Sequence, residues 1–173
     1  AFTQHGDPGG DIGATLNLPV ADRHALRLVG YMVSDGGYID NPLRGQKDTN
    51  RVDVRGGRGT FRFDAGNDWT IDLGGVYQSI QSDDAQYTDR DAPPLIRNSM
   101  VDQQASAKYG MATIVVMKDW GGLHFQSSNA AVSHRVFERF DASNLGNPSQ
   151  ILDQRNRTRL FVSETRLSRP YHN

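Results

Sequence analysis

Apolar and polar side chains alternate most clearly between Val52 and Gln78. Residues 58–63 alternate Arg, Thr and Arg with Gly, Phe and Phe, and every second residue from 69 to 77 is Trp, Ile, Leu, Gly or Tyr. A repeat of two places successive side chains on opposite faces of a β-strand. The intervening residues read DAGND and favour a turn. We therefore predict a hairpin with a turn at Asp64–Asp68 and with strands longer than the usual ~5–6 residues.

The same period predicts the other strands of an all-β, antiparallel fold. Pro19 should end the first of them, because proline has no N–H to donate to a neighbouring strand. With the hairpin, the chain then has about seven strands. The remaining predicted strands cover residues 9–18, 23–34, a part of 100–117 that is clearest at 112–117, 122–137 and 155–167.

The connections between these strands alternate between short and long. The predicted short turns are 19–22, 64–68 and 118–121, the predicted long loops are 35–50, 82–98 and 141–153, and residues 168–170 resemble the start of another short turn. Outer-membrane barrels have short periplasmic turns and long extracellular loops, because their strands run up and down through one bilayer. A soluble sandwich has no reason to sort its loops in this way. The order therefore favours a segment of a transmembrane β-barrel.

Aromatic residues near the strand ends agree with a barrel. Trp69 and Trp120 lie beside predicted short turns, whereas Tyr31, Tyr77 and Phe137 lie near the starts of long loops. Barrels place aromatic residues at both membrane interfaces. The distance from residue 69 to residue 77 along a strand is about 26 Å at ~3.3 Å per residue. A tilt near 40° reduces this to roughly 20 Å of height, which is close to the ~25 Å apolar band of a barrel.

Composition narrows the classes of function. The 173 residues include 19 Lys and Arg against 20 Asp and Glu, for a net charge of -1, which argues against a nucleic-acid partner bound mainly by charge. The absence of cysteine excludes disulfides, zinc–thiolate sites and cysteine nucleophiles within these residues. No apolar run reaches the ~18 residues of a transmembrane helix. A mean hydropathy of -0.61 remains compatible with a barrel, because only every second residue of its strands faces lipid.

Two groups of residues are candidates for function. One group of polar strand residues should face the lumen of a barrel, or water on the outer face of a sandwich: Asn17, Arg27, Arg58, Arg62, Asp72, Glu164 and Arg166. The other group lies in the first two long loops and offers aromatic and polar contacts to a ligand: Tyr38, Asp40, Asn41, Arg44, Tyr87, Asp89 and Arg90. For Tyr38, a purely structural role beside Gly36 and Gly37 is the alternative.

Metal and catalytic sites are not expected. The acidic loop from Asp83 to Asp91 could attract calcium, but it lacks the D-x-[DN]-x-[DN]-G spacing of a calcium loop. The histidines form no H-E-x-x-H motif, and no G-x-S-x-G nucleophile elbow is present. A lipase pairing of His134 with Ser133 or Ser128 has little support. We therefore expect no metal, no cofactor and no enzymatic activity.

Residues 16–41 read LNLPVADRHALRLVGYMVSDGGYIDN. Through Asn17, Pro19, Ala25 to Arg27, Gly30, Tyr31 and Gly36 to Asn41, this stretch resembles the segment just after the plug domain of TonB-dependent receptors of Gram-negative bacteria. The resemblance extends over nearly the whole chain. Residues 58–63 and 69–77 resemble the next hairpin, and residues 82–87 its following loop. Residues 156–170, with Glu164-x-Arg166-Leu167-Ser168, resemble a later strand and its exit.

This resemblance implies a roughly 22-stranded barrel with a plugged lumen in the bacterial outer membrane. Such receptors import a scarce ligand, such as an iron–siderophore, cobalamin or a saccharide, with energy from the inner-membrane TonB complex. About seven strands are fewer than the eight of the smallest closed barrel. We therefore expect residues 1–173 to be the N-terminal part of a receptor barrel domain, without its plug.

The implied partners are outer-membrane lipid, the imported small molecule and, through a part of the receptor outside this chain, the TonB complex. No nucleic-acid partner is expected. The alternative is a soluble β-sandwich that binds a ligand such as a carbohydrate.

Overall fold

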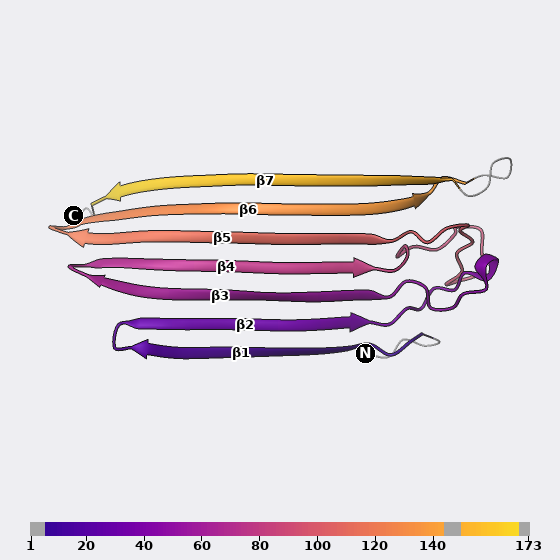
Figure 1. The fold of residues 1–173 in the computed structure, drawn as a ribbon, viewed down its shortest axis with the longest axis horizontal. Helices are drawn as coiled ribbons and strands as arrows, with labels where there is room; N and C mark the ends of the chain where they lie inside the picture. The colour runs from indigo at the N-terminus through magenta and orange to yellow at the C-terminus, as the bar shows by residue number, and fades with distance from the viewer. Residues whose placement is uncertain (1–5, 144–149, 170–173) are drawn as a thin grey trace.

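Seven long strands form a single antiparallel sheet in which each strand pairs with its neighbours in the sequence (Figure 1). The structure is a computed structural model that describes residues 6–143 and 150–169. The predicted all-β, antiparallel fold is confirmed. The elements are β1 (Gly10–Ala21), β2 (His24–Asp35), the 3-10 helix η1 (Pro42–Arg44), β3 (Val52–Gly66), β4 (Trp69–Ser82), β5 (Ala105–Trp120), β6 (Leu123–Asp141) and β7 (Ile151–Ser168).

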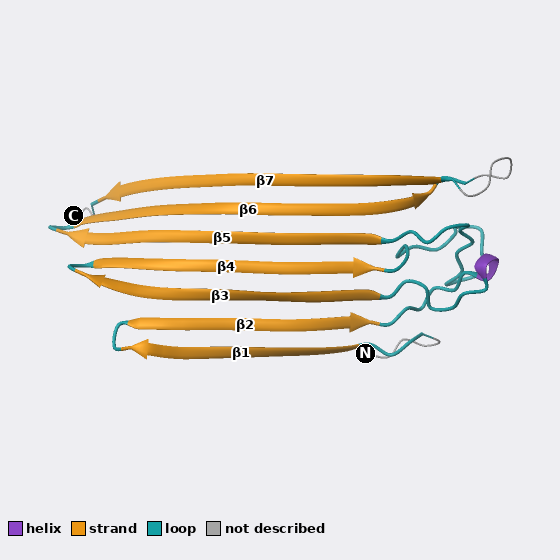
Figure 2. Ribbon diagram, in the orientation of Figure 1, coloured by secondary structure: helices purple, strands orange, loops and turns teal. Residues whose placement is uncertain are grey.

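The short turns gather at one end of the sheet and the long connections at the other (Figure 2). Asn67 and Asp68, with φ angles of 49° and 63°, join β3 to β4. Gly121 and Gly122, with φ angles of 54° and 76°, join β5 to β6. Two successive positive φ angles match the right-handed twist of a hairpin. The predicted alternation of short and long connections is therefore confirmed among the described residues.

Two predicted boundaries are wrong. The turn expected over Asp64–Asp68 is shorter, because β3 continues to Gly66 across a register shift between Asp64 and Gly66. Pro19 does not end β1, which continues to Ala21. The register of β1 shifts between Pro19 and Ala21, and such an irregularity is a place where a strand tolerates proline.

Other strand ends extend past the predicted ranges. The strand sought within residues 100–117 is β5, and the loop expected at 141–153 begins only after β6 ends at Asp141. The turn expected at 168–170 extends outside the described residues, which end at Arg169. No helix in the described ranges is long and apolar enough to cross a membrane.

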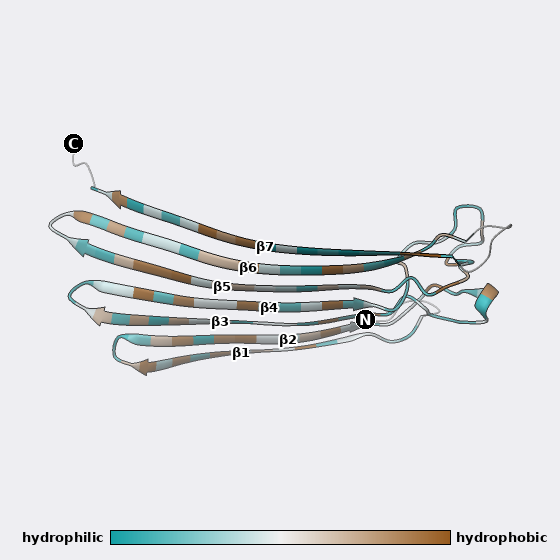
Figure 3. Cartoon of the chain, turned by 45° about the horizontal axis from the view of Figure 1, so that its top comes forward, coloured by the Kyte–Doolittle hydropathy of each residue, from teal (hydrophilic) through white to brown (hydrophobic). Residues whose placement is uncertain are grey.

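The register separates an apolar face from a polar face over most of the sheet. One row across β1 to β5 consists of Leu18, Leu26, Phe61, Leu73 and Ile114, and it defines the apolar face. The neighbouring row, on the polar face, contains Asn17, Arg27, Thr60, Gly74 and Thr113. The apolar row changes character on β6 and β7, where Asn129 accepts a 2.7 Å hydrogen bond from Ser163. Figure 3 shows how hydropathy varies along each strand.

No described strand residue is buried. Leu73 and Ile114, at the centre of the apolar face, keep 44% and 40% of their surface exposed. A soluble sheet normally buries at least one face against another layer. Nothing in the described part of this chain covers either face.

The short turns step progressively outward across the sheet. His24, at the start of β2, lies in one row with Phe63, Ile71 and Val116. Beyond this row, β3 and β4 continue to their own turn, and β5 continues to Trp120 (Figure 1). Such a stagger is what strands tilted to a common axis produce.

Most of the predicted interface aromatics lie on the apolar face. At the short-turn end, the Trp69 and Trp120 rings lie 6.2 and 6.4 Å from the ring of Phe125. Tyr77 and Phe137 lie on the same face by register, nearer the long loops. Tyr31 does not belong with them, because register places it on the polar face. The Tyr31 hydroxyl accepts a 2.9 Å hydrogen bond from Gln78 Nε2, and its ring covers Gly56, where a Cβ would lie 2.3 Å from the hydroxyl oxygen.

Candidate functional site

The buried side chains of the described chain all lie in the first two long loops rather than in the sheet. Residues 36–51, between β2 and β3, and residues 83–104, between β4 and β5, pack against each other and form what we call the loop cluster. Its buried side chains are Ile39, Asn41, Asn50, Asp84, Arg97, Ser99 and Gln103. Six of these seven are polar, so hydrogen bonds rather than apolar packing hold the cluster together.

Two buried asparagines connect the loop backbones. Asn50 Oδ1 accepts hydrogen bonds of 2.7 and 2.8 Å from the backbone N–H groups of Tyr38 and Ile39. Asn50 Nδ2 donates to Gln86 Oε1 at 2.9 Å. Asn41 Nδ2 donates to both the backbone oxygen and the hydroxyl of Ser99, each at 2.9 Å. Because buried polar groups are costly when unpaired, these amides fix the relative position of the two loops.

An ion pair closes the cluster between the loops. Arg44 is brought into place by η1, whose N-cap Asn41 accepts a hydrogen bond from the Arg44 N–H. The Arg44 guanidinium donates to Asp84 Oδ2 at 2.5 Å and also to the Asp102 carboxylate. Asp84 Oδ1 accepts from the backbone N–H groups of Ala85 and Gln103. Asp84 is 2% exposed, and these donors compensate for the burial of its charge.

Tyr87 and Arg97 form the outer side of the cluster. The Arg97 guanidinium carbon lies 4.0 Å from the centre of the Tyr87 ring, and its Nη2 donates to the Tyr87 hydroxyl at 3.2 Å. The Tyr87 hydroxyl donates to Gln103 Oε1 at 3.2 Å. Tyr87 nevertheless keeps 53% of its surface exposed. This aromatic surface is supported by the cluster and remains open to a ligand.

The structure brings the predicted loop contacts together and divides them into two kinds. Asp40, Asn41, Arg44 and Asp89 are engaged within the cluster: the Asp40 backbone pairs with Leu95 and Arg97, and Asp89 Oδ2 accepts from the Asn98 N–H at 2.6 Å. Tyr38 is half-buried, whereas Tyr87 and Arg90 are exposed. Of the seven predicted contacts, Tyr87 and Arg90 offer the most surface to a ligand.

The predicted lumen residues share one face of the sheet. Register places all seven on the polar face: Asn17, Arg27, Arg58, Arg62, Asp72, Glu164 and Arg166. Arg62 and Asp72 lie opposite each other and form a bidentate pair with two 2.7 Å hydrogen bonds. Asn17 lies opposite Arg27, and Arg166 donates to Glu164 on the same strand at 2.6 Å. That these residues face a lumen stays a prediction.

The sequence did not identify the residues whose hydrogen bonds hold the two loops together. It also did not identify the residues that line a polar hollow beside these loops. Asn50, Ser99 and Gln103 belong to no periodic pattern, and their partners lie up to 58 residues away, so no local signal identifies them. A hollow of about 440 Å³ is lined mainly by charged and polar side chains. None of the seven predicted contacts is among its described lining residues, which are Asp7, Gln46, Lys47, Asp48, Thr49, Arg51, Asp83, Asp102 and Gln104.

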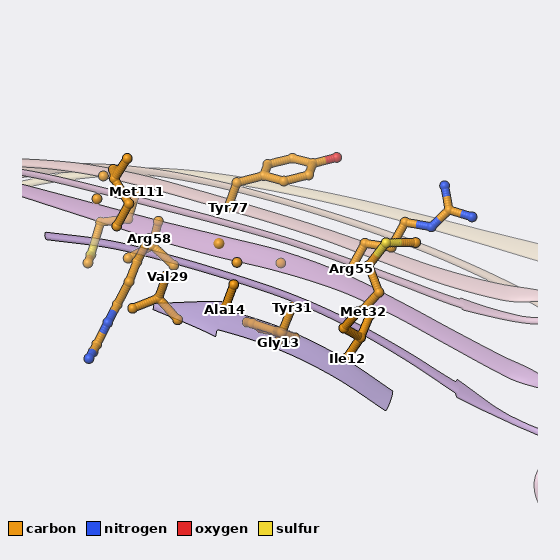
Figure 4. A pocket seen from close by; sticks show the side chains of 17 residues that line it. Ile12, Gly13, Ala14, Val29, Tyr31, Met32, Arg55, Arg58, Tyr77 and Met111 are labelled. Carbon is orange, nitrogen blue, oxygen red and sulfur yellow. The ribbon is translucent and has the colours of Figure 1, made fainter. Parts of the chain in front are cut away.

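Another hollow, of about 880 Å³, lies along the apolar face over β1 to β4 (Figure 4). Gly30, Gly57, Gly59 and Gly75 share that face and leave room between the larger side chains. Tyr77 borders the hollow, while Arg58 points to the opposite side of the sheet (Figure 4). This surface is shallow and apolar, and it offers no cluster of polar groups for catalysis.

Metal and nucleophile candidates find little geometric support. Among residues 6–143 and 150–169, no group of three or more Asp, Glu, His or Cys side chains could hold a metal ion. In the acidic loop, Asp84 pairs with Arg44 and Asp89 with Asn98. Ser133 and His134 are consecutive strand residues, so their side chains lie on opposite faces.

Comparison with protein-family models, with curated proteins and with solved structures found no match to this chain.

One half-buried carboxylate in the loop cluster, that of Asp48, is poorly compensated. Burial, and then the negative charges of Asp7 and Asp40, raise the pKa of Asp48 above its usual 3.8, although Lys47 opposes this. Asp48 Oδ1 is buried without a hydrogen-bond partner. Its backbone has a φ of 51°, a left-handed conformation that asparagine and aspartate tolerate better than most residues.

Replacing Asn50 with alanine should loosen the loop cluster. The N–H groups of Tyr38 and Ile39 would lose their shared acceptor, at a cost of about 1–3 kcal/mol for each buried donor. We expect these two amides to exchange hydrogen about tenfold to hundredfold faster, measured by hydrogen exchange with mass spectrometry or NMR. Asn98→Ala, which removes an exposed side chain of the same cluster, is the control. Unchanged exchange in Asn50→Ala would contradict the role assigned to Asn50.

Asp48→Asn should stabilise the loop cluster at neutral pH. Because the pKa of Asp48 is raised in the folded protein, its ionisation disfavours folding, and the wild type gains stability as pH falls through that pKa. The advantage of Asp48→Asn should therefore disappear by about pH 3, where the aspartate is neutral in both states. Thermal unfolding of both proteins across this range measures the difference. The exposed Asp91→Asn is the charge-matched control, and an equal or pH-independent gain there would refute the explanation.

Proposed function

We propose that these strands form part of the wall of a transmembrane β-barrel in a bacterial outer membrane, in a receptor of the TonB-dependent type. The observation that carries this proposal is a seven-stranded sheet without a single described buried strand residue and with one largely apolar face. Lipid would cover the apolar face, and the interior of the barrel would lie against the polar face. A bilayer thus supplies the missing layer.

The distribution of side chains along the strands supports this orientation. From Trp69 to Tyr77 on β4, the apolar face carries only apolar or aromatic residues and glycine. This length corresponds to about 26 Å of strand, or roughly 20 Å of height at a tilt near 40°. Beyond Tyr77 the same face continues with Ser79 and Gln81. The change from apolar to polar at that level is what a membrane interface requires.

The topology supports a barrel as well. Strand neighbours in sequence are neighbours in the sheet, short turns share one end, and the stagger of these turns fits tilted strands. In a bilayer, the outer edges of β1 and β7 must pair with further strands, because unpaired backbone groups are costly in lipid. Those strands would come from the same polypeptide or from another chain.

Import of a ligand is the function that the family resemblance adds. The loop cluster would lie on the extracellular side, with Tyr87 and Arg90 exposed at its surface. An iron–siderophore, cobalamin or a saccharide would meet these side chains before entering the barrel. Release into the periplasm would require the TonB complex, acting through a part of the receptor outside these 173 residues.

Lipid exposure should follow a period of two along the strands. Because these 173 residues contain no cysteine, single spin labels can be placed at Leu28 and Ile114 on the apolar face and at Val29 and Val115 on the polar face. In proteoliposomes we expect labels at Leu28 and Ile114 to collide with oxygen more often than labels at Val29 and Val115. The labels at Val29 and Val115 should have less contact with lipid. Electron paramagnetic resonance with oxygen and a water-soluble nickel chelate measures both collision rates.

A soluble sandwich would give a different result. Its apolar face would be shielded from both reagents, and the protein would remain monomeric in water without detergent. Either finding would exclude the membrane barrel.

Removal of Arg90 should weaken ligand capture without disturbing the fold, because Arg90 is exposed in the second loop. We expect Arg90→Ala to lower the affinity for the imported ligand about tenfold, which corresponds to ~1.4 kcal/mol. Uptake of labelled iron–siderophore, cobalamin and saccharide by cells with and without the TonB complex identifies the ligand and measures the loss. Arg23→Ala, at the opposite end of the sheet, is the control. Wild-type uptake by both Arg90→Ala and Tyr87→Ala would disprove the loop contact, and TonB-independent uptake would disprove the receptor type.

A further inference from the structure

A small hollow lies on the polar face of the sheet, where β4, β5 and β6 meet the loop cluster. Register places Ser82 opposite Ala105 and Ala105 opposite Glu138, so these three lining residues form one row across the strands. Phe140 follows on the same face of β6, and Tyr87 lines the hollow from the loop cluster. The volume of the hollow is about 180 Å³. We call it the mouth hollow.

One lining residue is a buried amide whose nitrogen has no partner. Gln103 is 4% exposed, and its Oε1 accepts hydrogen bonds from the Tyr87 hydroxyl at 3.2 Å and from the Asp141 N–H at 3.1 Å. Because a backbone N–H can only donate, it fixes the amide oxygen on its own side. Gln103 Nε2 is therefore left buried without a hydrogen-bond partner in the described part of the chain. An acceptor from a ligand would remove the cost of this unpaired donor.

Glu138 presents the opposite requirement. Its side chain is half-buried, and among residues 6–143 and 150–169 no side chain forms an ion pair or hydrogen bond with its carboxylate. An ionised carboxylate only accepts hydrogen bonds. The methyl group of Ala105, opposite Glu138 on β5, leaves space beside this carboxylate. A ligand in the mouth hollow must therefore donate to Glu138 and accept from Gln103.

The Tyr87 ring adds an apolar surface with a fixed orientation. The Arg97 guanidinium lies over the ring, with its carbon 4.0 Å from the ring centre, and Gln103 holds the Tyr87 hydroxyl. More than half of the Tyr87 surface nevertheless remains exposed. An aromatic side chain offers a broad apolar body beside a polar tip. The C–H groups of a ligand can pack on this ring while its polar groups reach Gln103 and Glu138.

These requirements select one class of ligand. An ammonium group donates to Glu138 but offers no acceptor to Gln103, and a carboxylate or phosphate has the opposite defect. A sugar ring meets both requirements, because each hydroxyl donates and accepts and because its C–H groups form an apolar face. Pockets for drug-sized ligands usually measure about 300–1,000 Å³. The mouth hollow, at about 180 Å³, therefore has room for one ring and not for a whole iron–siderophore or cobalamin.

We propose that the mouth hollow binds one ring of a neutral saccharide, which rests on the proposed import function and names the class of its ligand. One sugar hydroxyl accepts a hydrogen bond from Gln103 Nε2, another donates to the Glu138 carboxylate, and the ring packs on Tyr87. The hollow lies on the polar face at the end of the long loops. In the proposed barrel this is the extracellular mouth of the lumen, where an imported sugar passes from the loops to the interior.

The test measures saccharide binding by the complete protein that contains this chain. The protein is purified in lauryldimethylamine oxide, a detergent without a sugar headgroup, and applied to an array of neutral, acidic and amino oligosaccharides. We expect it to bind neutral oligosaccharides. Saturation-transfer difference NMR with the best neutral oligosaccharide should then show transfer to the C–H protons of one ring.

Two variants examine the hollow itself. Glu138→Gln keeps the shape of the side chain but replaces an accepting oxygen with a donor, and it should lower the affinity for this oligosaccharide about tenfold. Ala105→Leu should abolish binding by filling the hollow without a change of charge. Circular dichroism checks the sheet content of both, and the isosteric Glu138→Gln keeps the test decisive if Ala105→Leu does not fold.

Matched controls make the same changes elsewhere on the polar face. Asp11→Asn removes an exposed carboxylate from β1, and Ala25→Leu adds the same bulk near the short turns. Both should bind the oligosaccharide like the wild type, and neither cyanocobalamin nor a ferric trihydroxamate should displace it. Failure to bind any neutral oligosaccharide, wild-type affinity of Glu138→Gln, or displacement by either of these larger ligands would each overturn the proposal.

Failure of this inference is distinguishable from failure of the proposed function. If the spin labels show lipid contact in a period of two but no neutral oligosaccharide binds, only the saccharide site is wrong. If an oligosaccharide binds in the hollow but the labels show no lipid contact, the membrane function is wrong, and the site belongs to a soluble carbohydrate-binding protein.

Discussion

Backbone hydrogen bonding between neighbouring strands is the interaction on which this structure depends. β5 and β6 pair without a register shift from Ala105 opposite Glu138 to Trp120 opposite Leu123. No second layer of the described chain packs on either face, so backbone hydrogen bonds are the main interaction that holds the sheet together. In water such a sheet would leave its apolar face exposed. In a bilayer the same ladders become stronger, because no water competes for the backbone groups.

The pleat of the strands gives the sheet two faces that carry different kinds of side chains. On the polar face, Arg62 and Asp72 neutralise each other across two strands. On the apolar face, small and large residues alternate in level, with glycines in the middle of β2 to β4 and aromatic side chains toward the short turns. On β6 and β7, Asn129 and Ser163 interrupt the apolar surface but satisfy each other by hydrogen bonding. The loop cluster is stabilised differently from the sheet. Hydrogen bonds of its buried polar side chains fix the loops, whereas backbone hydrogen bonds between strands fix the sheet.

The strands and their faces could be predicted from the sequence, because polar and apolar residues alternate along a strand as its side chains alternate between the two faces. Trp69, Ile71 and Leu73, which the alternation groups on one side of a strand, share the apolar face. Strand boundaries were harder to predict. Pro19 remains within β1 because the register shifts between Pro19 and Ala21, an irregularity that the local sequence does not reveal.

The loop cluster could not be predicted for a physical reason. Asn41 and Ser99 are 58 residues apart, and nothing periodic connects them. Of the candidate ligand contacts, exposure favours Tyr87 and Arg90, a distinction that only the folded loops provide.

The contacts between the two loops have a consequence for the order of folding. Every pairing in the sheet joins consecutive strands, and the strands joined by two-residue turns need to close only short loops, which forms hairpins on a time scale of about 1–10 μs. The bond from Asn41 to Ser99 spans β3, β4 and the loop that follows. We expect it to form after these strands have aligned, because their pairing shortens the free chain that the contact must close. The loop cluster thus forms late in folding and stabilises a sheet already assembled from neighbouring hairpins.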